Sequence, residues 1–447
     1  MEENKSSSKE GQLEWWQLSL IGVGCIIGTG YFLGSGLAIH NAGPSVIISY
    51  VLAAFATYVV FDALAKMTKD DPQKGSFRSY AKKAYGRWAG FSTGWVYWCS
   101  EMLIMGSQMT ALSIFSRFWF PNVPLWVFAA CYAVFGIIVV LMGTKGFDRL
   151  ENVFAVMKVS AIFMFIVIAF LALCGVLDEG KGFRFPMTIQ QLFPNGVMGL
   201  WASLIYAFYS FGGIEIMGIL AIRLRKKEDA PKSGSFMLLL LALIYCISLG
   251  LVVMMDSWRA FNSKESPFVI ALNDYHLPFF PHIFNGALII AGFSTMCASL
   301  FSVTSMLVTL AQDGDAPASL AKKGKWKLKV PIKALALTTA GMAASVILAL
   351  AMPNKVYEYI TTAAGLMLLY NWFFILLSSR RIIELSTWGK TKGWIGMVLI
   401  VLAVSGTLLE ETSRFGFFGS LLSVGIIALV VLKMRSNWKK EEKPAPV

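Results

Sequence analysis

The amino-acid sequence predicts an all-α membrane protein whose helices cross the bilayer many times. Hydrophobic residues make up 56% of the 447 positions, charged residues only 15%, and the mean hydropathy is +0.64. A soluble globular chain carries about 25% charged residues. The sequence also contains twelve apolar runs, each close to or longer than the ~20-residue helix that spans a bilayer. The predicted fold class is therefore a polytopic bundle of twelve transmembrane helices.

The predicted spans follow one another along most of the chain. They lie near residues 18–40, 44–66, 88–116, 124–143, 153–176, 196–222, 234–256, 282–311, 332–352, 357–379, 393–409 and 416–433. Of the 39 Lys and Arg residues, 31 lie in the two tails or in loops after even-numbered spans, and seven lie in loops after odd-numbered spans. The positive-inside rule then predicts that both tails are cytoplasmic, in a multi-pass protein of the cell membrane.

Two strongly basic stretches of the sequence do not require a nucleic-acid partner. Residues 223–232 and 322–333 are rich in Lys and Arg, but both lie directly beside predicted spans. Juxtamembrane positive charge of this kind is explained by topology. Membrane lipid is therefore the expected surrounding. The six cysteines lack the CxxC or Cys/His spacing that is typical of zinc sites, so no metal site is expected.

The first predicted span is unusual because residues 18–36 contain six glycines. Glycine costs about 1 kcal/mol relative to alanine inside a helix, so Gly28-Thr29-Gly30 favours local unwinding. Unwound backbone at membrane depth is tolerated only beside a protein cavity or water, where its bare N–H and C=O groups can bind a ligand. The alternative is close helix packing through small residues, because Gly30 and Gly34 form a GxxxG pair.

A second interruption is predicted in the sixth span, where residues 209–215 read YSFGGIE. Two interrupted helices in corresponding positions of two halves point to a transporter built from repeats. Because the interruptions are five spans apart, the second repeat is inverted relative to the first. The predicted organisation is an N-terminal tail (1–17), a ten-span transport core (18–379), two appended helices (380–433) and a C-terminal tail (434–447).

The two interruptions together suit a zwitterionic ligand. Half-helix ends expose amides with partial positive charge and carbonyls with partial negative charge. An amino acid carries a carboxylate and an ammonium group close together, so it fits such a pair of ends. We expect the carboxylate at the amides of Thr29 and Gly30 and at the Thr29 hydroxyl. We expect the ammonium group at the carbonyls of Ile26, Tyr209 and Gly212.

Several motifs in chain order resemble those of a known family. They are GCIIGTGYFLGSG (24–36) with AGPS (42–45), KGSFRSYAKKAYGRWAGFSTGWVYW (74–98), ENVFAVMKV (151–159), FYSFGGIE (208–215) and SVTSMLVTLAQDGDAP (302–317). The sequence resembles an amino-acid permease of the amino acid–polyamine–organocation superfamily, closest to its bacterial amino acid transporter branch. The resemblance covers about residues 18–379. It implies the leucine-transporter-type fold with alternating access. It also implies ligand contacts at the positions chosen above from the helix-end charges, which are Ile26, Thr29, Gly30, Tyr209 and Gly212.

Lys158 is the only basic residue in the middle of a predicted span, and such residues are functional by default. Sodium-coupled relatives of this fold hold a sodium ion between helices 1 and 8, and similar proton-coupled permeases place a helix-5 lysine amine there. Lys158 matches that position. We expect its ammonium group to bond first-span carbonyls near Ile21–Gly24 and a hydroxyl such as that of Ser302. The alternative is a purely structural lysine.

Glu101 departs from the family pattern, which usually has an apolar or small residue at this position of the third helix. Met105 and Gln108 follow it at i+4 and i+7 and are expected on the same helical stripe. A carboxylate there could pair with a cationic or hydrogen-bonding substrate side chain. It could equally be protonated or paired internally. All three residues are therefore candidate substrate contacts.

Three further positions concern the second interruption and the inner gate. Glu215 is expected to stabilise the break beside Gly213 by accepting backbone N–H bonds. Relatives usually have an acidic residue where Arg223 stands and an arginine where Ser305 stands. Both departures lie toward the cytoplasmic side, so they bear on inner-gate ion pairing. Gly28 and Gly213 are predicted to be structural residues of the breaks.

The predicted function is secondary import of an amino acid by proton symport, driven by the proton gradient without any cofactor. The alternatives are an amino-acid exchanger of the same fold and a membrane receptor that senses amino acids. A channel is disfavoured because no repeated polar or charged rings are found. An enzyme is not expected, because no nucleophile–base pair, HExxH motif or P-loop is present. Neither the particular amino acid nor the oligomeric state follows from the sequence.

Overall fold

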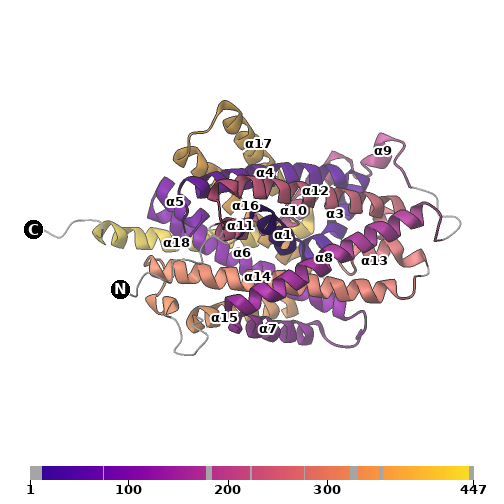
Figure 1. Ribbon diagram of the computed structural model, residues 1–447, viewed down its shortest axis with the longest axis horizontal. Helices are drawn as coiled ribbons and strands as arrows, with labels where there is room; N and C mark the ends of the chain where they lie inside the picture. Colours follow the sequence, from indigo (N-terminus) through magenta and orange to yellow (C-terminus); the bar gives the residue numbers. More distant parts are fainter. Residues whose placement is uncertain are drawn as a thin grey trace, which may run out of the picture.

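The structure is a computed structural model that describes residues 13–73, 75–177, 184–221, 224–275, 277–322, 331–351 and 356–441. Helices dominate this part of the chain, and no β-strand occurs in it. Figure 1 shows an elongated bundle in which the long helices lie along the longest axis, with α1, α10 and α11 near its centre. The all-α class predicted from the sequence is confirmed.

The α-helices are named in chain order. They are α1 (Trp15–Ile26), α2 (Thr29–Phe32), α3 (Gly34–Ala42), α4 (Val46–Asp70), α5 (Phe77–Tyr85), α6 (Arg87–Ser116), α7 (Leu125–Leu141), α8 (Gly143–Leu173), α9 (Ile189–Leu192), α10 (Gly196–Tyr209), α11 (Ile214–Leu220), α12 (Ala230–Met255), α13 (Pro267–Leu272), α14 (Phe280–Gln312), α15 (Ile332–Ala351), α16 (Val356–Ile382), α17 (Thr387–Gly406) and α18 (Glu411–Glu441).

The helices have the length and surface of membrane-spanning segments. Seven helical stretches in the described ranges are long and apolar enough to cross a bilayer, and three shorter apolar helices accompany them. Large apolar side chains are exposed along the outer helices, including Phe163 on α8 (66% exposed) and Leu429 on α18 (68% exposed). A run of exposed apolar side chains on a folded chain marks contact with lipid. The chain is therefore a multi-pass membrane protein.

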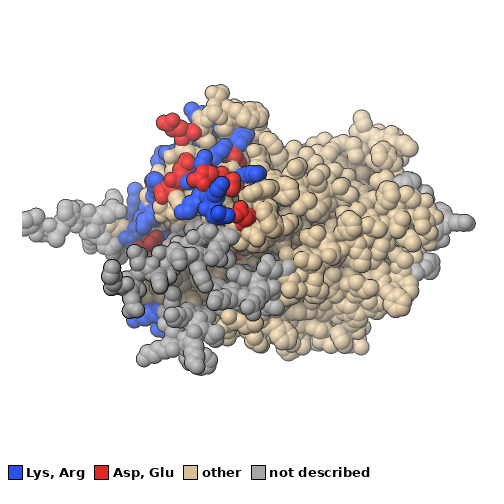
Figure 2. Space-filling view, viewed as in Figure 1, with Lys and Arg blue, Asp and Glu red and all other residues tan. Residues whose placement is uncertain are grey.

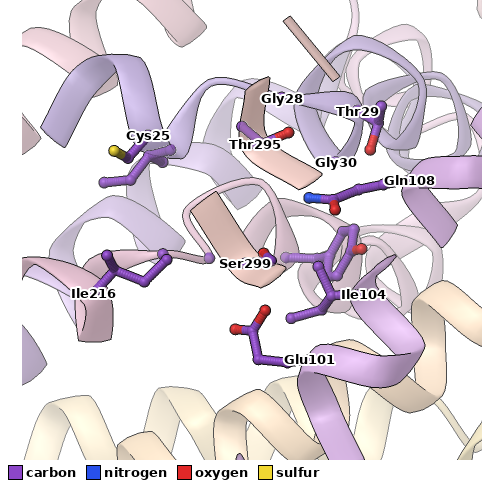
Figure 3. Close-up of a pocket in the computed structure, with 14 residues that line it drawn as sticks. Cys25, Gly28, Thr29, Gly30, Glu101, Ile104, Gln108, Ile216, Thr295 and Ser299 are labelled. Carbon is purple, nitrogen blue, oxygen red and sulfur yellow. The ribbon is translucent and has the colours of Figure 1, made fainter. Parts of the chain in front are cut away.

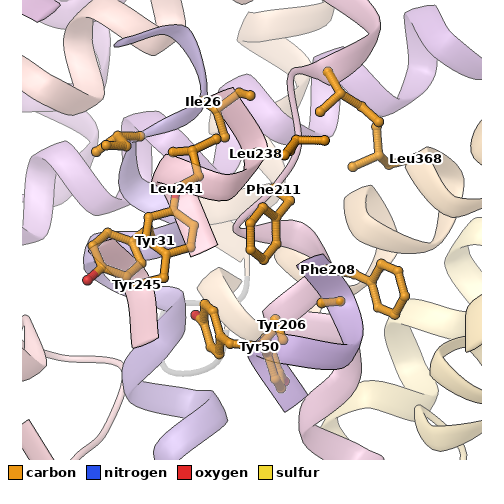
Figure 4. Packing of buried hydrophobic residues seen from close by; sticks show 14 of the residues in the cluster. Ile26, Tyr31, Tyr50, Tyr206, Phe208, Phe211, Leu238, Leu241, Tyr245 and Leu368 are labelled. Atoms are coloured by element: carbon orange, nitrogen blue, oxygen red, sulfur yellow. The ribbon is translucent and has the colours of Figure 1, made fainter. Parts of the chain in front are cut away.

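Aromatic rings at the centre of the bundle pack the first interrupted helix against its neighbours (Figure 4). Tyr31 of α2 stacks on Tyr245 of α12, with ring centroids 3.9 Å apart. Tyr245 also contacts Phe211, which lies between α10 and α11, and Tyr50 of α4. All four side chains are buried. Buried aromatic pairs contribute about 0.5–1.5 kcal/mol beyond their area, so this cluster fixes the two interrupted regions beside each other.

Charged side chains gather at one end of the bundle, around α5 and the ends of neighbouring helices (Figure 2). Arg78 of α5 is fully buried and pairs with Asp313 (Nη1 to Oδ2, 2.6 Å) and with Asp315. Arg87 Nε also lies 2.8 Å from Asp315 Oδ1. This charge cluster, Arg78, Arg87, Asp313 and Asp315, joins the connection between α4 and α6 to the end of α14.

The structure differs from the sequence-based boundaries in three places. The first helix begins at Trp15 and the last continues to Glu441, so residues 434–441 of the predicted C-terminal tail are helical. The basic connection after α4 contains its own helix, α5, which the hydropathy pattern does not reveal because the helix is too short to span a bilayer.

Arg223 lies outside the described residues. Ser305 donates to the Phe301 carbonyl of its own helix (2.9 Å).

Candidate functional site

The first interruption lies between α1 and α2. Helix α1 ends at Ile26, Gly28 is extended (φ −156°, ψ −159°), and α2 begins at Thr29. The unwound residues are therefore 27 and 28, slightly earlier than predicted, and Thr29 and Gly30 form the first turn of α2. Their backbone N–H groups donate to no acceptor in the described part of the chain, because the first N–H groups of a helix lack an intrahelical partner.

Two glycines at this interruption are required by close contacts. A Cβ atom on Gly28 would lie 2.7 Å from the Thr295 side chain of α14. A Cβ atom on Gly30 would lie 2.9 Å from the Tyr209 ring. The absence of a side chain at both positions lets α14 and α10 approach the unwound backbone.

The second interruption lies between α10 and α11. Helix α10 ends at Tyr209 and α11 begins at Ile214, with Gly213 in the left-handed region (φ 112°). The Gly213 N–H donates to Glu215 Oε1 (3.2 Å), and Trp372 Nε1 donates to Glu215 Oε2 (3.2 Å). The carboxylate in the first turn of α11 also opposes the positive end of the helix dipole. Glu215 thus closes the break from its own side.

Ser210 connects the two interruptions, although no role was predicted for it from the sequence. Its hydroxyl donates to the Gly30 carbonyl (3.0 Å) and lies 2.8 Å from the Tyr50 hydroxyl. The Tyr245 hydroxyl donates to the Ser210 carbonyl (3.0 Å). A serine next to Phe-Gly-Gly in an apolar run is the only sequence signal for this contact. The hydroxyl satisfies a carbonyl that the broken helix leaves bare.

A buried cavity lies where the two interruptions meet (Figure 3). Its volume is about 40 Å³, room for about three waters. Nine predicted residues line it: Ile26, Gly28, Thr29, Gly30, Glu101, Gln108, Tyr209, Gly212 and Gly213. Five lining residues were not predicted: Cys25, Ile104, Ile216, Thr295 and Ser299. Thr295 and Ser299 are one helical turn apart on α14, a spacing that could have indicated a shared polar face.

Met105 does not line the cavity, contrary to the stripe predicted for the third span. It is fully buried in an apolar cluster with Met102 and Met109 on an adjoining face of α6. A helix turns about 100° per residue, so positions 101, 104 and 108 lie within about 60° of one another. Position 105 lies outside this arc, about 40° beyond Glu101 and about 100° from Ile104, and Ile104 takes the place predicted for it.

Three polar atoms of the cavity wall lack a partner. Thr29 Oγ1, Glu101 Oε2 and Gln108 Oε1 are buried and form no hydrogen bond with any described residue. The carbonyls of Ile26 and Gly212 likewise accept no backbone hydrogen bond within the described ranges. Native proteins leave few buried polar groups unpaired, and each one calls for a ligand, water or strain as its explanation. Three such side-chain atoms around one cavity, together with two carbonyls that accept no backbone N–H from the described residues, indicate a binding site.

Lys158 lies outside the cavity, against the back of the first interrupted helix. Its side chain is fully buried on α8, and Nζ donates to the Gly24 carbonyl (2.5 Å), two residues before α1 ends. Ser302 of α14, the hydroxyl suggested for it, lies 2.9 Å from the Tyr97 hydroxyl of α6.

We expect Glu215→Ala to destabilise the second interruption. The change leaves the Gly213 N–H and the Trp372 indole N–H buried without their acceptor, and each orphaned donor costs about 1–3 kcal/mol. The measurement is the apparent melting temperature of the purified protein in detergent. Glu215→Gln keeps one acceptor oxygen, so its melting temperature should lie between those of the wild type and Glu215→Ala. If Glu215→Ala is as stable as the wild type, Glu215 does not stabilise the second interruption.

An all-helical membrane chain with two interrupted helices that meet at a buried polar cavity has the features of a secondary transporter. A family model described as amino acid permease matches residues 17–434. The chain is 53% identical, over the full length of both, to a protein named uncharacterized transporter YcgH from Bacillus subtilis (strain 168). It is 31% identical to the amino-acid permease RocC of the same organism over 84% of this chain and 81% of RocC.

A further relative is the aromatic amino acid transport protein AroP of Escherichia coli (strain K12), 30% identical over 81% of this chain and 79% of AroP. The chain belongs to the amino acid permease family, within the amino acid–polyamine–organocation superfamily. This is a family of transporters and not of enzymes, and its members' names support amino acid transport as the role of the chain.

Proposed function

We propose that this protein imports an amino acid across the cell membrane by proton symport with alternating access. The observation that carries the proposal is the cavity shared by the two interruptions. Unpaired amides at Thr29 and Gly30 suit a carboxylate, and unpaired carbonyls at Ile26 and Gly212 suit an ammonium group. The Tyr209 carbonyl accepts the Gly212 N–H (3.0 Å) and keeps a second lone pair for the ligand. The bound substrate would supply the hydrogen bonds that the interrupted helices cannot form within themselves.

The packing of the helices supports an inverted five-plus-five repeat. Under that repeat α1–α3 corresponds to α10–α11, α4 to α12, α6 to α14, and α8 to α16. Helix α4 packs on α10 and its counterpart α12 packs on α1. In the same way α6 packs on α16 and α14 packs on α8, while α4 with α16 matches α12 with α8. Exchanging the two halves preserves these contacts, so the packing supports the proposed repeat in addition to the spacing. Residues 18–379 are then the transport core, and residues 380–433 are two added helices.

Contacts between loops support the proposed topology of twelve spans with both tails cytoplasmic. The loops after the second and tenth spans contact each other, because Arg381 donates to the Ala84 carbonyl (3.1 Å). The loop after the sixth span contacts the N-terminal tail, because Arg225 pairs with Glu14 (3.0 Å). On the opposite side, Asn41 donates to Glu410 (2.9 Å), joining the loops after the first and eleventh spans. The basic side would face the cytoplasm.

Lys158 is the proposed coupling residue. When protonated, its ammonium group binds the Gly24 carbonyl and holds α1 against α8, so the site stays closed toward the cytoplasm. Loss of the proton would weaken this contact and let α1 move, releasing the substrate and the proton together. Ser302 and Tyr97 would stabilise the neighbouring face of α14. No cofactor takes part, and the proton gradient supplies the free energy.

Uptake by proteoliposomes tests the proposal. We expect purified full-length protein to accumulate at least one radiolabelled amino acid from a panel of twenty when the vesicle lumen is alkaline. A sodium gradient of the same size should have no effect. Uptake that requires a preloaded amino acid and ignores the pH gradient would identify an exchanger. Binding without any uptake would identify a receptor, and either result would overturn the symport proposal.

A further inference from the structure

We infer that Glu101 binds the cationic side chain of a basic amino acid, so that the transported substrate has lysine-, ornithine- or arginine-like chemistry. The inference rests on the proposed function, because it assumes that the backbone of the same amino acid occupies the two interruptions. It names the class of substrate, which the family alone leaves open.

The first observation is that one oxygen of the buried Glu101 carboxyl group has no hydrogen-bond donor in the described part of the chain. The side chain is 1% exposed, and Oε2 has no hydrogen-bond donor among the described residues. The hydroxyls of Ser299 and Tyr97 are hydrogen-bond partners of this carboxyl group, so Oε2 is the oxygen that remains without a donor from those residues. Burying an unpaired carboxylate is very costly in a membrane interior. A donor that arrives with the substrate would remove this cost.

Glu215 provides an internal comparison because it is equally buried in the same region. Both of its carboxylate oxygens have protein donors, the Gly213 N–H and the Trp372 indole N–H. Glu215 does not line the cavity, whereas Glu101 does. The protein thus supplies a donor to each oxygen of Glu215, whereas Glu101 lines an open space and its Oε2 has no donor among the described residues.

The second observation is the charge of the cavity wall. Among the residues that line it, Glu101 is the only one with an acidic side chain, and none is Lys, Arg or His. The carboxylate and ammonium groups of the substrate have neutral backbone groups as partners. The wall therefore has one acidic group and no basic group to balance it. A substrate with one additional positive charge provides that balance, whereas an acidic substrate would add repulsion.

The third observation is the separation between the ends of the cavity. Figure 3 shows Gln108 beside Thr29 and Gly30, while Glu101 lies at the other end near Ser299. Glu101 and Gln108 are seven residues apart on α6, a rise of about 10 Å. A substrate held at the interruption needs an extended side chain to reach Glu101. Lysine, ornithine and arginine have such side chains, and short polar amino acids do not.

The cavity in this conformation is smaller than such a substrate. Its volume of about 40 Å³ holds about three waters. Ile104 and Tyr209 line the middle, and the Tyr209 ring lies directly against Gly30. Binding of an extended side chain therefore requires these two side chains to move apart. The movement makes Tyr209 a gate that opens with the substrate.

Titration calorimetry on the purified full-length protein tests the inference. Each basic amino acid is paired with a neutral analogue of similar length, lysine with norleucine and arginine with citrulline. We expect the wild type to bind the basic member at least tenfold more tightly. We expect Glu101→Gln to lose at least tenfold affinity for lysine and arginine, and to change affinity for the neutral analogues less than twofold. Glu384→Gln, an exposed carboxylate outside the cavity, is the matched control and should behave as wild type.

Each other outcome has a definite meaning. Wild-type protein that binds neutral analogues as tightly as basic amino acids overturns the inference while leaving amino-acid transport intact. The inference is also overturned if Glu101→Gln prefers basic amino acids over neutral analogues as strongly as the wild type does. That result is expected if the Glu101 carboxyl group only carries a proton. If no amino acid binds or is taken up, the proposed function itself fails. The wild-type comparison needs no variant, so a misfolded Glu101→Gln protein would not prevent a decision.

Discussion

Replacing Lys158 with alanine is expected to reduce uptake driven by a pH gradient by on the order of 100-fold, near the upper end of typical coupling between two sites. The ammonium group of Lys158 is fully buried and bonds the Gly24 carbonyl at the end of α1. Without it, protonation no longer controls the position of the first interrupted helix. The measurement is initial uptake of radiolabelled substrate into proteoliposomes with an alkaline lumen.

The same vesicles provide the control that separates coupling from structure. Counterflow with substrate on both sides requires the binding site and its movement but no proton gradient. Lys158→Ala should keep counterflow within a few-fold of wild type, and exposed Lys390→Ala should keep both activities. If Lys158→Ala loses both activities and melts at a lower temperature, Lys158 is a structural residue. If it retains proton-driven uptake, the coupling role is wrong.

The second large effect is expected at the charge cluster. The Arg78 side chain is fully buried and pairs with both Asp313 and Asp315. Arg78→Ala removes its guanidinium group, so both carboxylates lose this partner. Removing one partner of a buried ion pair costs about 3–5 kcal/mol. We expect about 3 kcal/mol, the lower end, because Arg87 keeps its contact with Asp315 (2.8 Å). The apparent melting temperature in detergent should fall by several degrees.

Lys83→Ala is the matched control for this change. Lys83 lies on the same short helix, α5, and pairs with Asp71 (2.9 Å), but its side chain is 56% exposed. Exposed ion pairs contribute about 0–1 kcal/mol, so the melting temperature should hardly change. Equal effects of the two substitutions would show that burial of Arg78 does not matter. Unchanged stability in Arg78→Ala would show that the charge cluster is dispensable.

Much of the fold and site could be predicted from sequence because local chemistry determines it. Apolar runs of membrane length predict helices, since a backbone in lipid must satisfy its own hydrogen bonds. Gly28 and Gly213 predict interruptions, since glycine is a poor helix former. Lys158 stands out because an ammonium group in a span needs a partner. These signals depend on a residue and its immediate neighbours, and each falls at or beside the feature expected from it.

Only the tertiary structure decided which side chains share the cavity. Ile104 lines it while Met105 packs away from it, because a rotation of α6 too small to read from spacing determines which face meets α10. Ser210 bridges the two interruptions through Gly30, a contact between residues 180 positions apart. Whether Glu101 has an internal partner also depends on every helix around it. Contacts of this kind arise from long-range packing, which a local pattern does not encode.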